Sequence, residues 1–236
     1  MYLEIKHRIK VSLFQLLLKI LQGVFTFEFY EHNLHKIRIN LLRKANGVIH
    51  IGGSTGQEAQ VYSSFKLSVI WVECLPEVFE ILKNNISYFE NQSAMNYLLG
   101  QEAKEVEFFL TNNNFMSSSI YRLNLSNQSS KELKEIGTVK MKMVRLDSLF
   151  SKSEIHHFTH WVLDVQGAEL DVLRGAGVLL ESCQSIELEY SDYEVYLSAP
   201  PAREVVLFLE DNGFVQLLDT PRQFHGNAIF VRVQTP

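Results

Sequence analysis

The chain has few cysteines, which limits the kinds of site that it can form. Cys74 and Cys183 are the only two among 236 residues, so a disulfide framework is excluded, and no CxxC pair suggests zinc. His156 and His160 have the spacing of two metal ligands, but no HExxH acid accompanies them, and we predict a polar loop without a metal. Reduced cysteines indicate an intracellular protein, most simply a cytoplasmic one.

The chain also has no excess of positive charge. Its 22 Lys and Arg residues are outnumbered by 27 Asp and Glu residues, so the formal net charge is -5, which disfavours nucleic acid as a partner. The charge is unevenly spread, because residues 1–46 carry eight basic and three acidic side chains, a net charge of +5. The remaining residues therefore carry -10, and we expect the two segments to have different roles.

No uninterrupted apolar run is long enough for a transmembrane helix. Gln15, Lys19 and Gln22 interrupt the apolar stretch at residues 11–25, and no small-x-small cleavage site follows, so neither a membrane span nor a signal peptide is predicted. The stretch predicts a helix that packs on the rest of the protein. The alternative is a basic amphipathic helix through which residues 1–30 contact an anionic membrane peripherally.

Downstream of residue 46, β-branched apolar runs alternate with helical patterns. Strands are predicted at residues 48–51, 68–72, 96–99, 106–110, 139–144, 161–163, 185–190, 214–218 and 227–233, and helices at 57–65, 77–89, 170–180 and 202–212. No helix separates the last two strands, which should therefore pair antiparallel. This order predicts an α/β fold with a mostly parallel sheet and helices on both faces. We divide the chain into a helical extension, residues 1–46, and one domain, residues 47–236.

Polar residues at strand ends are the candidates for a site, because parallel sheets bind ligands at the carboxyl ends of their strands. Gly52, Gly53 and Gly56 follow the first strand, where glycine lets the backbone approach a ligand closely. Glu73 ends the next strand, near the spacing at which an acid accepts hydrogen bonds from ribose hydroxyls. The turn and the acid together predict a nucleoside-type ligand.

A second pair of candidates is acidic. Asp164 ends the strand at residues 161–163, and Glu189 lies on the strand that follows it in the chain. Neighbouring parallel strands are about 4.8 Å apart, so the two carboxylates could share a proton, hold a cation or bind a substrate hydroxyl.

These motifs together resemble one known family. Ile51-Gly-Gly-Ser-Thr-Gly56, Val72-Glu73, Leu99-Gly100 and the segment from Leu163 to Ala176 are similar to the FkbM-type family of S-adenosylmethionine-dependent methyltransferases. The likeness covers about residues 46–234, and Asp164–Ala176 is its most specific part. The resemblance implies a Rossmann-like seven-strand sheet with an antiparallel last strand. It also implies O-methylation of a hydroxyl on a sugar, a glycan or a small natural product.

The resemblance also implies roles for particular residues. The glycine turn would approach the methionine part of S-adenosylmethionine, and Glu73 would bind the ribose. The turn around Leu99, Gly100 and Gln101 would flank the adenine, and Asp164 would lie near the transferring methyl group. The family usually begins its first motif with Asp before Gly-Ala-Asn, whereas this chain has His50 before Ile51 and the turn. The candidate cofactor-binding residues are His50, Gly52, Gly53, Ser54, Gly56, Glu73, Cys74, Gly100, Gln101 and Asp164.

Methylation of a hydroxyl requires a group that takes its proton. The first candidate base is Asp164 together with Glu189, and a divalent cation could assist them although no motif indicates one. The second candidate is His225, in the turn before the last strand. Ser117 and Ser118 of the polar segment at residues 111–130, and Gln166, are the candidate substrate contacts.

Three other functions fit parts of the sequence. Because neutral His50 replaces an acid only weakly, the fold could be a degenerate methyltransferase that acts as a binding module. The motif from Gly52 to Gly56 also fits the GxSxG elbow of serine hydrolases, with Ser54 followed by Asp192 or Asp219 and then His225. Too few strands precede the motif for that fold. A nicotinamide dehydrogenase is disfavoured because no YxxxK motif lies in a suitable place.

Overall fold

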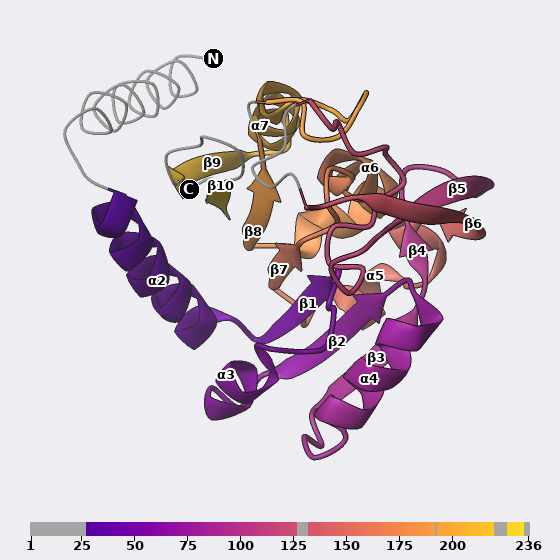
Figure 1. The fold of residues 1–236 in the computed structure, drawn as a ribbon. Helices are drawn as coiled ribbons and strands as arrows, with labels where there is room; N and C mark the ends of the chain where they lie inside the picture. The colour runs from indigo at the N-terminus through magenta and orange to yellow at the C-terminus, as the bar shows by residue number, and fades with distance from the viewer. Residues whose placement is uncertain (1–26, 127–131, 192, 220–225, 234–236) are drawn as a thin grey trace.

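The computed structural model describes residues 27–126, 132–191, 193–219 and 226–233 (Figure 1). The helix expected over residues 11–25 lies outside the described residues, and so does most of the segment expected to contact a membrane, residues 1–30. In the part of the chain that is described, no helix combines the length and the apolar character needed to cross a membrane.

The core of the protein is a seven-stranded sheet with the strand order β3-β2-β1-β7-β8-β10-β9. Its strands are β1 (Gly47–Ile51), β2 (Ser68–Glu73), β3 (Gln92–Asn96), β7 (His160–Leu163), β8 (Ser185–Tyr190), β9 (Phe214–Asp219) and β10 (Gly226–Arg232). The neighbours from β3 to β8 all pair in parallel, whereas β10 is antiparallel to both β8 and β9. The predicted sheet, including its antiparallel last strand, is confirmed.

Helices cover both faces of this sheet, because its central strands are apolar on both sides. Val48 and Trp71 pack with α3 (Ala59–Ser64) and α4 (Pro76–Ile86) on one face. Ile49 and Ile51 pack on the other face with α6 (Glu169–Ala176) and α7 (Ala202–Asp211). The short helix α5 (Lys152–Ile155) and the 3-10 helices η1 (Leu146–Ser148) and η2 (Gly177–Ser182) lie on this second side.

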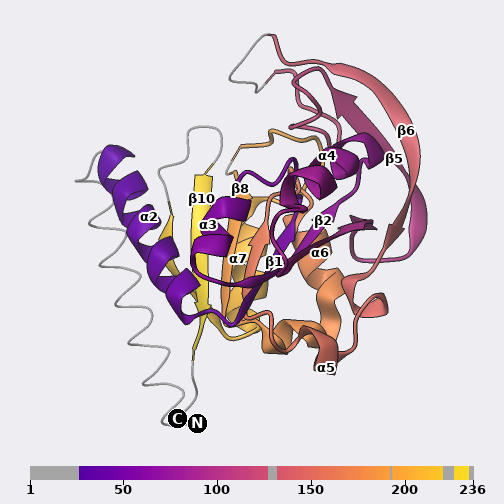
Figure 2. The ribbon, with the colours of Figure 1, turned by 90° about the horizontal axis from the view of Figure 1, so that it is seen from below.

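Helix α2 (Phe27–Lys44) packs over the β9–β10 end of the sheet (Figure 2). Leu34 is buried against Ile229 of β10, and Leu42 is buried in the cluster beside β1. Between them, the Arg38 guanidinium pairs with the carboxylate of Glu187 on β8, and Nε lies 2.9 and 2.8 Å from its two oxygens. This helix is therefore anchored to the sheet by apolar contacts and by one ion pair. The boundary at residue 46 stays a prediction.

A second sheet holds the strands β4 (Leu98–Leu99), β5 (Lys104–Thr111) and β6 (Glu135–Val144), in the order β4-β6-β5. The strand expected at residues 96–99 is wrong: β3 occupies residues 92–96 in the main sheet, and Leu98–Leu99 pairs with β6 instead. The amide of Asn96 marks this break, because it donates to the carbonyl oxygens of Glu73 and Cys74.

The helix expected over residues 170–180 is also too long. It ends at Ala176 because Gly177 adopts a φ of +51°, and the chain continues as the 3-10 helix η2.

Candidate active site

A cavity of about 240 Å³ opens at the carboxyl ends of β1, β2 and β7. This is where a parallel sheet is expected to bind its ligand. Nine of the sequence-predicted site residues line it: His50, Gly52, Gly53, Ser54, Glu73, Cys74, Ser118, Asp164 and Gln166. The parallel strands therefore bring most of the predicted site together at one edge.

The glycine turn joins the ends of three strands. The amides of Gly52 and Gly53 donate to the carbonyl oxygen of Val72 on β2, at 2.9 and 3.1 Å. Gly52 has a φ of +81°, and a Cβ atom there would lie 1.8 Å from the carbonyl oxygen of Asp164. Glycine is therefore required at this position because β7 approaches so closely. Gly56 does not line the cavity, and its α-carbon faces Leu82 of α4.

Glu73 is fixed at the cavity wall by backbone amides. Ser54 N donates to one of its carboxylate oxygens at 2.9 Å, and Leu75 N donates to the other at 3.0 Å. Burial raises the pKa of Glu73, and these hydrogen bonds act against the increase. Each oxygen keeps a further acceptor position, so the carboxylate can still receive hydroxyl donors from the cavity. The neighbouring Cys74 is half-buried, and the burial of its thiol raises the thiol pKa well above the usual range.

His50 is part of an aromatic cluster below the glycine turn. Its ring stacks on Trp71, with centroids 4.6 Å apart, and its Nδ1 lies 3.0 Å from the Tyr62 hydroxyl. Burial lowers the pKa of His50 to about 3, so the ring is neutral at pH 7 and brings no charge to the cavity. An acid does lie nearby: Glu58, at the start of α3, lines the same cavity, and burial raises its pKa. No sequence motif marks Glu58, so it was not among the predicted site residues.

Asp164 and Glu189 are linked by the amide of Gln166. Gln166 Nε2 lies 2.5 Å from Asp164 Oδ1 and 3.1 Å from Glu189 Oε2. Burial, followed by the negative charge of Asp164, raises the pKa of Glu189 to about 7. Gln166 itself adopts a φ of +55°, which is uncommon for a residue with a side chain. The two acids thus lie within reach of one amide, although Glu189 lines an adjoining cavity rather than this one.

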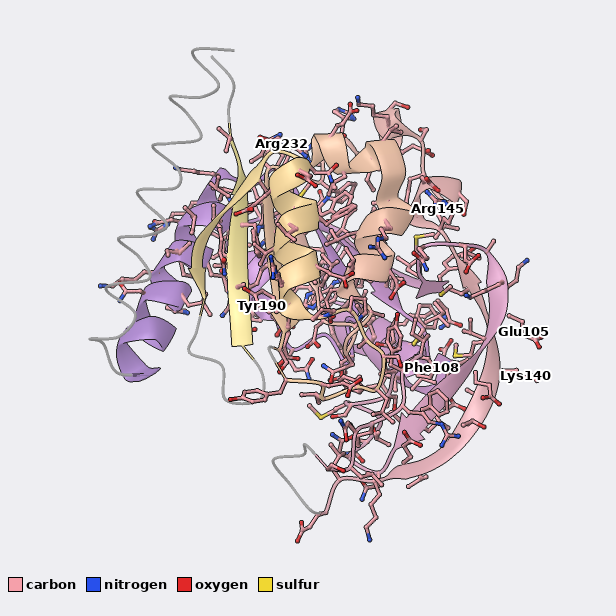
Figure 3. The ribbon with its side chains drawn as sticks, turned by 90° about the horizontal axis from the view of Figure 1, so that it is seen from above. Glu105, Phe108, Lys140, Arg145, Tyr190 and Arg232 are labelled. Carbon is pink, nitrogen blue, oxygen red and sulfur yellow. The ribbon has the colours of Figure 1, made fainter. Side chains whose placement is uncertain are left out.

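Only one of the three residues expected to flank an adenine, Leu99, lines the cavity. Gly100 and Gln101 do not line it: Gly100 packs against Met143, and its carbonyl oxygen faces Gly175 of α6. Other apolar side chains complete the wall beside Leu99: Tyr97, Leu98, Phe108, Phe115 and Ile120. Figure 3 shows Phe108 on the inner side of β5, with Glu105 and Lys140 on the outside. The alternating pattern of residues 106–110 predicted the strand. It did not predict that Phe108 faces the cavity, because that depends on the pairing of β5 with β6.

The polar segment between β5 and β6 places its two candidate serines differently. Ser118 lines the cavity, and its hydroxyl accepts a hydrogen bond from Thr111 N at 3.1 Å. Ser117 does not line it, and its carbonyl oxygen accepts from the Tyr196 hydroxyl at 3.1 Å. His225 lies outside the described residues.

Within the described ranges, no group of three or more His, Cys, Asp or Glu side chains is arranged to hold a metal ion. His156 is exposed in the loop after α5, whereas His160 is buried in β7 with its Nδ1 2.7 Å from the Ser185 hydroxyl. The two histidines therefore have different surroundings, and burial lowers the pKa of His160 to about 4.

Comparisons with known proteins agree on one chemistry. Residues 50–215 match the model of the methyltransferase FkbM domain. The chain is 23% identical over 205 residues to the 2-O-methyltransferase NoeI of Sinorhizobium fredii (strain NBRC 101917 / NGR234). This alignment covers 83% of this chain and 84% of that protein.

Two solved structures match this chain. Magnesium protoporphyrin IX methyltransferase (ChlM) from Synechocystis PCC 6803, with bound SAM, aligns with a TM-score of 0.48 at 10% identity, over 88% of this chain and 79% of that one. The methyltransferase domain of bacterial-CtHen1-C aligns with a TM-score of 0.47 at 10% identity, over 89% of this chain and 100% of that one.

Proposed function

The chain belongs to the FkbM family of methyltransferases, and from this membership we propose that it is an S-adenosylmethionine-dependent O-methyltransferase. Because the chain belongs to this family, we no longer propose the serine hydrolase or the dehydrogenase function. The proposed acceptor is a hydroxyl on a sugar, a glycan or a small natural product, in line with the activity that the relative's name gives. Nucleic acid is not proposed as a partner.

The cavity at the ends of β1, β2 and β7 has the chemical groups that the cofactor needs. Glu73, held by two backbone amides, offers carboxylate oxygens to ribose hydroxyls. The apolar wall that includes Leu99 and Phe108 suits an adenine ring. Asp164 and Glu58 supply negative charge near a cationic ligand. The fixed carboxylate of Glu73 is the single observation that carries this assignment.

Glu58 also bears on the unusual His50. The family's acid before the glycine turn is replaced by a ring that is neutral, buried and bonded to Tyr62. Glu58 lines the same cavity from the start of α3, so it can provide a negative charge from another part of the chain. This supports an active enzyme over a degenerate binding module.

The residues around Asp164 suit the handling of an acceptor proton. When bound, S-adenosylmethionine supplies an electrophilic methyl group on a sulfonium centre. Asp164 accepts a hydrogen bond from the acceptor hydroxyl and orients it. Glu189, whose pKa is raised to about 7 by burial and by the charge of Asp164, would hold the proton that the acceptor hydroxyl loses. Gln166 keeps the two carboxylates in register by donating to both.

Calorimetry with S-adenosylmethionine and S-adenosylhomocysteine tests the proposal. We expect both to bind the full chain, and Glu73→Gln to weaken binding by about 10- to 100-fold, the typical effect of hydrogen bonds to a charged group. Glu80→Gln, on the exposed side of α4, is the matched control and should bind as the wild type does. No detectable binding of either compound at millimolar concentration would refute the proposal.

A further inference from the structure

A second cavity, of about 300 Å³, adjoins the proposed cofactor cavity. It lies between the end of β8, the loop residues 193–201 and the start of α7, and Gln166 lines both cavities. Its polar lining includes Glu169, Glu189, Tyr193, Glu194 and Tyr196. The mechanism proposed above uses only Glu189 of this set, so the rest of the cavity has no assigned role.

Gln166 and Tyr196 form the partition between the two cavities. The Tyr196 hydroxyl lies 2.7 Å from Gln166 Oε1 and 3.1 Å from the carbonyl oxygen of Ser117. On the other side, the Gln166 amide donates to Asp164, which lines the first cavity, and to Glu189, which lines the second. A hydroxyl that takes the place of this amide would therefore reach both carboxylates from the second cavity.

The roof of the second cavity is held in place by the polar segment. Asn124 N donates to the carbonyl oxygen of Val195 at 2.8 Å, and Leu197 N donates to that of Arg122 at 2.7 Å. These backbone bonds join the segment between β5 and β6 to the loop before α7. The walls around Tyr196 are therefore fixed before a ligand arrives, which lowers the entropic cost of binding.

The ionisable side chains in the lining of this cavity are acids and tyrosines, with no Lys, Arg or His among the described lining residues. Burial raises the pKa of Glu169 to about 8 and that of Glu189 to about 7, and nearby carboxylates contribute to both increases. At pH 7 Glu169 is therefore mostly protonated and Glu189 about half ionised, so the charge that disfavours an anionic ligand comes from Glu189 and from the exposed carboxylate of Glu194. Hydroxyl and amino groups would instead donate hydrogen bonds to the ionised acids. The tyrosine rings add flat surfaces for an apolar face.

We propose that this second cavity binds the methyl acceptor and admits neutral or amine-bearing polyols while rejecting phosphorylated and carboxylated ones. The inference rests on the proposed function, because it needs the cofactor in the first cavity. Gln166 and Tyr196 are positioning residues in this scheme. The acceptor hydroxyl reaches Asp164 by taking the place of the Gln166 amide, so the hydrogen bond between Gln166 and Tyr196 opens when the acceptor binds.

The test uses the full chain saturated with S-adenosylhomocysteine, after calorimetry has established that this compound binds. The probes are methyl glycosides of glucose, galactose and mannose, each as the neutral sugar, the 2-amino, the uronate and the 6-phosphate form. We expect at least one neutral or amino sugar to bind at least tenfold more tightly than its two anionic forms. Equal or tighter binding of the anionic forms would overturn the proposal.

A charge reversal locates the effect. Glu194→Lys, in the exposed part of the cavity lining, should improve binding of the anionic forms at least tenfold relative to the neutral sugar. Glu80→Lys on α4 is the control and should leave the preference unchanged. If Glu194→Lys leaves the preference for neutral over anionic sugars unchanged, the assignment of the acceptor site to the second cavity is overturned. If S-adenosylhomocysteine binds and no sugar does, the acceptor proposal fails and the cofactor proposal stands. If S-adenosylhomocysteine itself does not bind, the proposed function fails first.

Discussion

Replacing Arg38 with methionine should destabilise the protein strongly, although Arg38 lies on α2, away from both cavities. Its guanidinium bonds both oxygens of Glu187, a carboxylate buried on the face of β8 beneath α2. Without Arg38, that charge would be left buried and unpaired. Breaking a buried pair costs about 3–5 kcal/mol, whereas replacing both partners with apolar residues is often neutral.

The magnitude follows from the exposure of the two side chains. Glu187 is 7% exposed and Arg38 35%, so water reaches one partner and we expect the lower end of the range, about 3 kcal/mol. Arg38→Met combined with Glu187→Leu should recover stability to within about 1 kcal/mol of the wild type. Lys152→Met is the control: the side chains of Lys152 and Glu181 are 57% and 63% exposed, so loss of this ion pair should leave the stability close to that of the wild type.

Urea unfolding followed by tryptophan fluorescence measures these differences, because Trp71 and Trp161 are both fully buried. If Arg38→Met unfolds at the same urea concentration as Lys152→Met, then α2 is not energetically coupled to the sheet. That outcome would favour the view of residues 1–46 as a separate extension. A double variant as unstable as the single one would show that the loss comes from packing and not from the unpaired charge.

Two further predictions concern the site. Burial raises the pKa of Glu169 to about 8, so the folded carboxyl keeps its proton to a higher pH than the unfolded one does. The wild type should therefore lose up to about 5 kcal/mol of stability between pH 4.5 and 8. The unfolding temperature of Glu169→Gln should fall less steeply with pH over this range, and an equally steep fall in both proteins would contradict the prediction. Gly52→Ala should cost more than about 2 kcal/mol and abolish binding of S-adenosylhomocysteine, because its Cβ would collide with the Asp164 carbonyl. Gly137→Ala, with open space around it, is the control, and equal behaviour of the two variants would refute the steric argument.

The main sheet was predictable because its strands carry strong local signals. All residues of β1 are buried and all but His50 are apolar, so the four-residue run at 48–51 was enough to identify the strand. The edge strand β3 has the polar sequence Gln92–Asn96 and is covered less completely, so its pattern gave no signal. The apolar pair Leu98–Leu99 was assigned to the main sheet because its true partner, β6, lies more than 40 residues further along the chain.

The site was predictable where parallel topology alone decides position. Glu73 and Asp164 both follow strands of one parallel sheet, so their meeting at one edge required no knowledge of loops. Gly100 turned out to face the packing between Met143 and α6, which depends on how the second sheet docks. The separation of Glu189 into its own cavity depends on the side chains of Gln166 and Tyr196, and no sequence pattern specifies where these side chains point.

The strand order also has a consequence for how the protein is synthesised. Strand β1 pairs with β7, and the matched residues Val48 and His160 are separated by more than a hundred positions. At about 5–20 residues per second, the ribosome needs roughly 6–22 s to make that stretch. During this time the apolar β1 presents an unpaired edge that invites association with other chains. The ion pair between Arg38 and Glu187 joins residues that are 149 positions apart, so it forms only after β8 has also been synthesised. Chaperone occupancy of nascent chains should therefore persist until β7 has left the ribosome.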